Sequence, residues 1–378
     1  MSSPGTPRPP TACGAWARSP APPSPWSPKK PAKAAHTPPK LYAGAMSENF
    51  RTRLPDPRLQ PRFAGISTFC RYPRLEDVEP AHQPVDWALF GVPFDSAVTY
   101  RPGARFGPRA IRDASQYVKH YHTEHDVDLR EVLSLADAGD APVLPYSCSA
   151  NADSVFDFAR GLADPSRTRL LAVGGDHSIA YPCIKAAWER RGRPERGLAM
   201  LHFDSHLDTV DAILGERFTH ASPFIRAIED GLIDPKRMLT VGIKGPLNTR
   251  HDLDYAKKHG VTVLTYEQWR GGGQRVIDDF VRTLADDEAY LSFDIDCIDP
   301  AYAPGTGTPS HGGFTSFEIF QALRSLRGAN IVGADVVEVL PDRDVNQNTA
   351  LLAGHVIFEI LALDAVRRSL GTPAPGRE

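Results

Sequence analysis

Short apolar runs alternate with longer amphipathic stretches along the chain from about residue 84. A short run rich in Val, Leu and Ile is typical of a buried strand, whereas apolar positions three or four apart indicate a helix. Eight strands are expected, at residues 85–92, 130–136, 168–175, 197–204, 237–243, 261–265, 289–296 and 330–339. Seven helices are expected between and after them, at residues 107–121, 178–191, 222–231, 251–260, 273–287, 315–328 and 348–368.

This order of elements predicts an α/β fold with three layers, in which helices cover both faces of a mostly parallel sheet of about eight strands. One continuous series without a linker after residue 50 indicates a single domain over residues 46–378. Open sheets of this kind bind ligands beyond the carboxyl ends of their strands. The strand ends are therefore the expected place of a functional site.

Residues 1–45 differ in composition from the rest of the chain. They contain 12 of the 35 prolines and six Lys or Arg side chains, but no Asp or Glu. Such a segment buries too little apolar surface to offset the entropy lost on ordering, so we expect a disordered tail. Organelle transit peptides are also basic and free of acids, although prolines break the amphipathic helix that they form. Translation from Met46 is a further alternative.

The overall composition argues against several classes of function. The formal net charge of −3, from 43 basic and 46 acidic side chains, provides no field that would gather nucleic acid or an anionic membrane surface. The chain has no run of about 18 or more apolar residues, so no membrane-spanning helix is expected. Five widely spaced cysteines without a C-x-x-C pair fit a reducing compartment, and we expect a cytoplasmic protein.

The first candidate for chemistry is LLAVGGDHS, in which a predicted strand leads into Gly174 and Gly175. Two glycines permit a tight turn with positive φ, which would leave His177 at the carboxyl edge of the sheet. Asp176 or Ser178 is expected to cap the helix that follows.

The second candidate is LHFDSHLDT. Residues two apart in a strand point to the same side, so Asp204, His206 and Asp208 would present two carboxylates and an imidazole together. Like charges raise each other's pKa, whereas a divalent metal ion stabilises the ionised carboxylates. His202 lies within the apolar part of the strand and is expected to be a packed core residue.

The third candidate is AYLSFDIDCIDP, an apolar strand that ends in Asp294 and Asp296 on one face. Asp299 directly precedes a proline, which favours a turn over a metal ligand. The three strand ends together offer four carboxylates and two imidazoles, borne by His177, Asp204, His206, Asp208, Asp294 and Asp296. This set exceeds the needs of one tetrahedral zinc and favours Mn or Mg. Two neighbouring metal ions are the simplest solution, and such pairs acidify a water molecule into a nucleophile.

At these residues the sequence resembles the ureohydrolase family of arginases and agmatinases. GGDHS, D-x-H-x-D and S-F-D-x-D-x-x-D-P occur in that order, and the similarity extends over about residues 60–368, including RPGARFGPRAIR at 101–112 and DPAYAPGTGTP at 299–309. The resemblance implies an arginase-like fold, release of urea from a small guanidino compound, two Mn²⁺ ions with Ni²⁺ as the alternative, and a homo-oligomer such as a trimer or hexamer.

The resemblance also implies how the site residues divide their work. One metal ion would be bound by His177, Asp204, Asp208 and Asp294. The other would be bound by Asp204, His206, Asp294 and Asp296, the last of which also counts as catalytic. His220, in RFTHASPF, would relay protons, since an imidazole titrates near neutrality. Glu338, at the end of NIVGADVVEV, would hold the planar guanidinium through paired hydrogen bonds.

Departures from the family pattern bear on the substrate. Ser205 replaces the usual alanine, Ala221 replaces a glycine after His220, and the segment 341–348 is unusual. The fragment HLDT, with Thr209, resembles the agmatinase and guanidino-acid branch, which makes agmatine or a guanidino acid such as 4-guanidinobutanoate the expected substrate. Alternatives are a nickel-dependent guanidine hydrolase, a non-catalytic subunit with a disabled pocket, and a deacylase with one zinc ion.

Overall fold

An eight-stranded sheet forms the centre of the described part of the chain. The computed structural model describes residues 50–370, so the predicted tail at 1–45 and the predicted domain start at Met46 lie outside the described residues. In spatial order the strands are β4 (Leu135–Asp140), β1 (Trp87–Val92), β5 (Arg169–Gly174), β10 (Asn330–Val337), β9 (Glu288–Asp294), β6 (Leu198–Phe203), β7 (Ile233–Ile243) and β8 (Thr262–Thr265). All neighbouring pairs are parallel, which confirms the predicted sheet.

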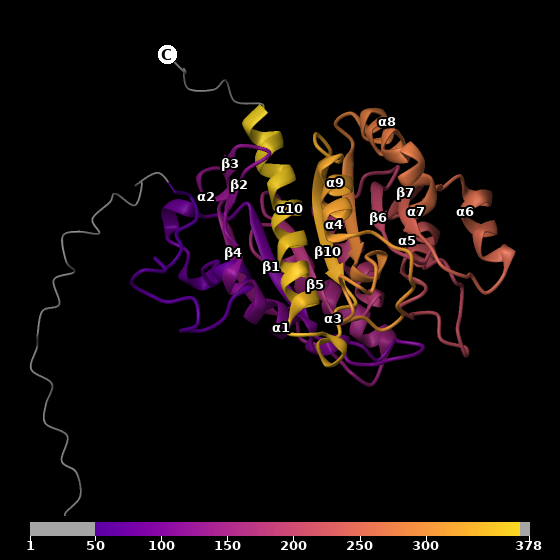
Figure 1. The fold of residues 1–378 in the computed structure, drawn as a ribbon, viewed down its shortest axis with the longest axis horizontal. Helices are drawn as coiled ribbons and strands as arrows, with labels where there is room; N and C mark the ends of the chain where they lie inside the picture. Colours follow the sequence, from indigo (N-terminus) through magenta and orange to yellow (C-terminus); the bar gives the residue numbers. More distant parts are fainter. Residues whose placement is uncertain (1–49, 371–378) are drawn as a thin grey trace, which may run out of the picture. The chain divides into compact units, whose positions relative to one another are not determined.

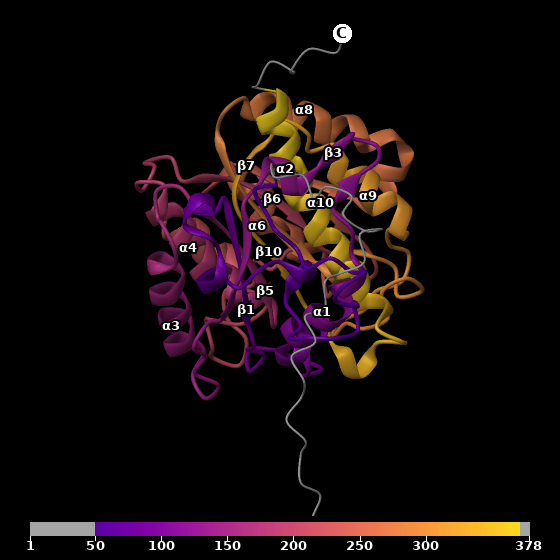
Figure 2. The ribbon, with the colours of Figure 1, turned by 90° about the vertical axis from the view of Figure 1, so that its left-hand side faces the viewer.

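Helices cover both faces of the sheet, because alternate strand residues are apolar on both sides (Figures 1 and 2). Leu291 and Phe293 face a core shared with α1 (Gly107–Ala114), α8 (Gln274–Leu284), α9 (Ser316–Arg324) and α10 (Asn348–Leu370). Tyr290 faces a second core shared with α3 (Cys148–Gly161), α4 (Ala180–Arg190), α5 (Pro223–Glu229) and α6 (Asp254–His259). The minor elements are α2 (Leu129–Val132), α7 (Tyr266–Gln268), β2 (Tyr121–His122) and β3 (Val127–Asp128). The three-layer prediction is therefore confirmed.

The predicted elements differ from the observed ones in a few places. The strand expected at 130–136 begins only at Leu135, because Leu129–Val132 forms a helical turn capped by the Asp128 carboxylate. Helix α3 was not predicted at all. It buries Asn151 and a short apolar stripe of Ala152, Val155 and Ala159, and because two of these three side chains are alanines the stripe gives only a weak amphipathic pattern.

No helix long and apolar enough to cross a membrane was expected from the sequence. Helix α10 is such a helix by length and composition. In the structure 83% of its most apolar 18-residue stretch is buried, and Val356, Ile357 and Ile360 pack in the core against the sheet. Among the described residues, α10 is therefore placed as a core helix of the α/β fold.

Gly175 sets the direction in which the chain leaves β5. Its φ is +24°, and a Cβ atom on it would lie 2.2 Å from the Phe94 carbonyl oxygen and 2.6 Å from the Val92 carbonyl oxygen. Only glycine allows the backbone to approach so closely.

We therefore predict that Gly175→Ala lowers the free energy of unfolding by about 2 kcal/mol or more, because backbone atoms cannot move away cheaply. The measurement is urea unfolding followed by circular dichroism. Gly192→Ala is the matched control, since Gly192 also has positive φ but no atom within 4 Å of the added Cβ. That control should cost only about 1 kcal/mol. Equal effects of the two substitutions would contradict the steric explanation.

Candidate metal centre

Three strand ends meet at the carboxyl edge of the sheet. His177 begins the 3₁₀ turn after β5, Asp204 directly follows β6, and Asp294 is the last residue of β9. Parallel strands end at the same edge, and β10 lies between β5 and β9 while β6 lies next to β9. The sheet order therefore brings together residues more than a hundred positions apart in the sequence.

His177 lies at the centre of the first group of side chains. Its Nδ1 lies 2.9 Å from a carboxylate oxygen of Asp208, 3.1 Å from one of Asp204 and 3.3 Å from one of Asp294. Its Nε2 lies on the far side of the ring, 2.8 Å from the Ser292 hydroxyl oxygen. All four side chains of the group are almost completely buried. The predicted ligands of one metal ion are thus neighbours.

His206 contributes to a second group that shares Asp204. The Nδ1 of His206 lies 3.1 Å from an Asp296 oxygen and 3.4 Å from an Asp204 oxygen. Its side chain is 38% exposed, whereas the two carboxylates are fully buried. Asp294 connects this group to the first, because its carboxylate accepts the backbone N–H of Asp296 at 2.8 Å. All six predicted side chains therefore come together in one cluster.

Polar neighbours hold the carboxylates of the cluster in place. His202 lies with Nε2 2.9 Å from Asp204, so this histidine is buried as expected but also contacts the cluster. The Ser205 hydroxyl and backbone N–H donate to Asp296 at 2.7 and 3.1 Å. Thr308 donates a further hydrogen bond to Asp296 at 3.3 Å. Ser205, a departure from the family pattern, thus supports a predicted metal ligand.

Burial and charge shift the pKa values of the clustered carboxyls. Burial raises the pKa of Asp294 well above its ordinary value, and the charges of Asp296 and Asp204 add to this effect. Burial also acts to raise the pKa of Asp204, but its contacts with the neighbouring histidines outweigh burial and hold the pKa well below its ordinary value. Ionisation of Asp294 is therefore less favourable in the metal-free cluster than in water.

One buried atom tests whether a cation fits this cluster. Nδ1 of His177 has no hydrogen-bond partner, although three carboxylate oxygens lie within 3.3 Å of it. A nitrogen lone pair among anionic oxygens is unfavourable by itself and is the arrangement that a divalent cation requires. Carboxylate oxygens and imidazole nitrogens are suitable ligands for Mn²⁺ or Ni²⁺. The residues present therefore fit bound divalent metal ions.

His220 and Glu338 lie beside the cluster and contact each other. Nδ1 of His220 lies 3.1 Å from Glu338 Oε1, and Nε2 accepts the backbone N–H of Thr99 at 3.1 Å. Nδ1 donates a proton to Glu338, which also accepts the backbone N–H of His177 at 2.9 Å. Burial lowers the pKa of His220, but Glu338 outweighs burial and raises the pKa to about 9. The Thr99 hydroxyl, 2.8 Å from Nε2, can accept the second ring proton.

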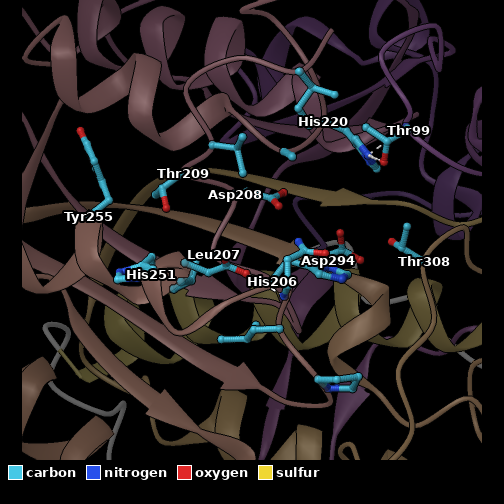
Figure 3. Close-up of a pocket in the computed structure, with 17 residues that line it drawn as sticks. Thr99, His206, Leu207, Asp208, Thr209, His220, His251, Tyr255, Asp294 and Thr308 are labelled. Carbon is cyan, nitrogen blue, oxygen red and sulfur yellow. Dashed lines mark hydrogen bonds between the residues drawn. The ribbon is translucent and has the colours of Figure 1, made fainter.

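A cavity of about 470 Å³ opens onto the cluster. His206, Asp208 and Asp294 lie together, and His251 and Tyr255 lie apart from them, on the side away from Thr308 (Figure 3). His220 and Thr99 form a further part of the wall, beside Thr308 (Figure 3). Glu338 is not among the lining residues and is only 1% exposed. It lies behind His220, so a direct contact between Glu338 and the guanidinium stays a prediction.

Two acidic residues near the motifs have the structural roles expected of them. The Asp176 carboxylate caps the turn that starts at His177, because it accepts the Ser178 N–H at 3.0 Å. The Asp299 carboxylate accepts backbone N–H groups at 2.7 to 3.1 Å, from Ala301, Gly312 and Gly313. Neither carboxylate belongs to the cluster around His177 and His206.

Sequence reasoning missed the residues that support the cluster by hydrogen bonds. Ser292 stands two residues before Asp294 on the same face of β9, and Thr99 lies in a loop two residues before the segment RPGARFGPRAIR. A signal existed for Ser292, because a polar side chain in an apolar strand calls for a buried partner. No comparable signal pointed to Thr99.

Comparison with known proteins agrees with this geometry. The arginase family model matches residues 85–363. Guanidinopropionase of Pseudomonas aeruginosa is 42% identical over 305 residues, which cover 80% of this chain and 93% of that protein. Mitochondrial agmatinase of Gallus gallus is 37% identical over 307 residues, with coverage of 80% and 86%. The structure of proclavaminate amidinohydrolase from Streptomyces clavuligerus superposes with a TM-score of 0.75 at 36% identity, covering 82% of this chain and 100% of that one.

The fold and the family match define a class of metal-dependent hydrolases, and the chain belongs to the arginase family. Within this family it is an amidinohydrolase, an enzyme that cleaves a C–N bond of a small linear guanidino compound. The expectation of a non-catalytic subunit is therefore not supported, and neither is that of a deacylase with one zinc ion. Family membership also implies a binuclear site for divalent metal ions.

Removal of divalent metal ions is predicted to lower the melting temperature, because the buried carboxylates lose their counter-charge. An ion present at about 100 times its dissociation constant should stabilise the fold by about 2.7 kcal/mol. Thermal unfolding with and without a chelator measures this difference, and K⁺ at equal ionic strength is the control. A melting temperature that does not respond to divalent ions would contradict the prediction.

Proposed function

We propose that this chain releases urea from a short guanidino acid, such as 3-guanidinopropanoate or 4-guanidinobutanoate, with the help of two Mn²⁺ ions. The observation that carries the proposal is the convergence of six donor side chains at one end of the cavity. One ion would be held by His177, Asp204, Asp208 and Asp294. The other would be held by Asp204, His206, Asp294 and Asp296, of which Asp296 is also proposed as catalytic.

The reaction needs a nucleophile, a positioned carbon and a proton for the leaving amine. Bound metal ions would supply a water acidic enough to act as a nucleophile at neutral pH. The guanidino carbon gains the oxygen of water, its bond to the substituted nitrogen breaks, and the amine leaves with a proton. His220 is the proton-handling residue of the cavity wall, and Glu338 orients it through Nδ1 at 3.1 Å.

The set of ligand atoms supports Mn²⁺ over zinc. We also propose Mn²⁺ over Ni²⁺. Four carboxylates against two imidazoles form an oxygen-rich environment, which suits Mn²⁺, whereas Ni²⁺ is favoured by nitrogen donors. Urea release measured with each ion added separately to metal-free protein tests this choice. Activity with Ni²⁺ and guanidine alone would instead support a guanidine hydrolase.

The far end of the cavity supports a substrate with a carboxylate tail. Agmatine would need an acid there for its ammonium group, and the acid available among the described lining residues is Asp252. Its carboxylate already accepts the N–H groups of Asn248 and Thr249 at 2.9 and 3.3 Å. His251 and Tyr255 offer hydrogen-bond donors instead. The guanidinopropionase relative, whose name includes a guanidino acid, points the same way.

Compartment and assembly complete the proposal. We place the enzyme in the cytoplasm because Cys70, Cys148, Cys183 and Cys297 are free thiols, although the chicken relative is named as mitochondrial.

The homo-oligomer, trimer or hexamer, stays a prediction. Phe63, Ile66 and Tyr117 are exposed apolar side chains that such contacts could cover.

Asp294→Asn is predicted to abolish urea release and to weaken the binding of both ions, since Asp294 is shared between them. Metal content after dialysis and urea release measure the two effects. Asp299→Asn is the matched control from the same motif, because the Asp299 carboxylate bonds only to backbone N–H groups in the described structure. It should keep both ions, and full activity of metal-free protein would refute the proposal.

We predict that guanidino acids are used with kcat/KM at least about tenfold above that for agmatine, a difference of about 1.4 kcal/mol. A urea-release screen over 3-guanidinopropanoate, 4-guanidinobutanoate, agmatine, arginine and guanidine measures this ratio. His251→Leu should raise KM for the guanidino acids and leave guanidine, which lacks a tail, unaffected. A preference for agmatine would overturn the substrate assignment but not the hydrolase assignment.

A further inference from the structure

Three polar side chains form a buried chain of hydrogen bonds behind His177, on the side away from the cluster. Tyr290 and Ser292 lie two apart on β9, and Asp335 is the β10 residue paired with Ser292. The Ser292 hydroxyl donates to one Asp335 oxygen at 2.6 Å, and the Tyr290 hydroxyl donates to the other at 2.8 Å. Ser292 Oγ also lies 2.8 Å from Nε2 of His177. Each of these side chains is at most 1% exposed.

The hydrogen bonds of this chain determine where the proton of His177 lies. An ionised carboxylate only accepts hydrogen bonds, and a serine hydroxyl has a single proton to donate. Since Ser292 donates that proton to Asp335, its oxygen can only accept from His177. Nε2 of His177 must therefore carry the ring proton, which leaves the lone pair on Nδ1 facing Asp204, Asp208 and Asp294.

The opposite tautomer would place an N–H group among the carboxylates. Such an N–H group would donate to an oxygen 2.9 to 3.3 Å away and occupy the space of a cation. We propose that Ser292 and Asp335 are positioning residues that hold His177 in the tautomer and ring orientation needed to bind one of the two metal ions. This inference rests on the ligand set of the proposed function.

The other ligand histidine has no comparable support. His206 is 38% exposed, and the hydroxyl nearest to its ring is that of Ser205, 3.4 Å from the same Nδ1 that faces the carboxylates. No described residue hydrogen-bonds to its Nε2. Loss of the buried chain should therefore weaken only the metal ion that His177 holds, and a general loss of structure would weaken both.

Ser292→Ala tests the inference by metal binding. Metal-free protein is titrated with Mn²⁺ by calorimetry, and free Mn²⁺ is counted by its electron paramagnetic resonance signal. Removal of such a support typically costs 10–100-fold in metal affinity. We expect one of the two dissociation constants to rise by about that factor while the other keeps its wild-type value.

Tyr290→Phe is the matched control. It removes the other donor to Asp335 from the same strand and face but keeps the contact between Ser292 and His177, so both constants should stay at wild-type values. If Ser292→Ala does not fold, Asp335→Leu replaces it. That change removes the acceptor of the Ser292 proton without leaving a large cavity, so the hydroxyl can donate to Nε2, and the same single constant should rise.

The outcomes separate this inference from the proposed function. Two wild-type constants, or an equal rise in both, in the folded Ser292 variant would overturn the positioning role. Wild-type protein that binds fewer than two Mn²⁺ ions would instead overturn the proposed ligand set. Selective weakening of one ion, with Tyr290→Phe unchanged, supports both.

Discussion

The mutual repulsion of four buried carboxylates is the constraint on which the rest of the structure depends. Asp204, Asp208, Asp294 and Asp296 are each at most 8% exposed, and they lie around two imidazoles. Without a cation, burial raises the pKa of Asp294 and of Asp208 and so opposes the ionisation of these two carboxyls. Divalent ions turn the same arrangement into a stabilising one. The fold has to bring these charges together and hold them until metal ions bind.

The parallel sheet provides the framework for this convergence. Its order places β5, β9 and β6 close to one another although β9 is far from the other two in sequence, and their carboxyl ends share one edge. The backbone around the cluster is held in less favoured conformations, since Asp208 and Glu338 have φ values of 49° and 64°. Strain of this kind persists only where surrounding structure enforces it. Here the apolar cores on both faces of the sheet supply that enforcement.

The two histidines of the cluster differ in burial and in the hydrogen bonds that they form outside the cluster. His177 is fully buried, and its far nitrogen contacts Ser292 on the neighbouring strand β9. His206 lies on a loop beside the cavity and is partly exposed. A rigid half and an accessible half suit an enzyme that must hold its metal ions and still admit a substrate. His220 lines the cavity beside the cluster, and Glu338 lies behind it and contacts the backbone of His177.

The sequence by itself located seven of the eight strands and the six clustered side chains, because both follow from local patterns, whereas β4 begins only at Leu135. Apolar runs of strand length locate the sheet, and polar residues directly after such runs must lie at its carboxyl edge. Helix α3 was not found in this way, since its buried apolar stripe is short and contains two alanines. The tertiary structure alone decided the partners of these residues. That Asp335 supports Ser292, that Thr99 contacts His220, and that Glu338 lies behind His220 depend on strand register and loop position, which only the packing of the whole domain sets.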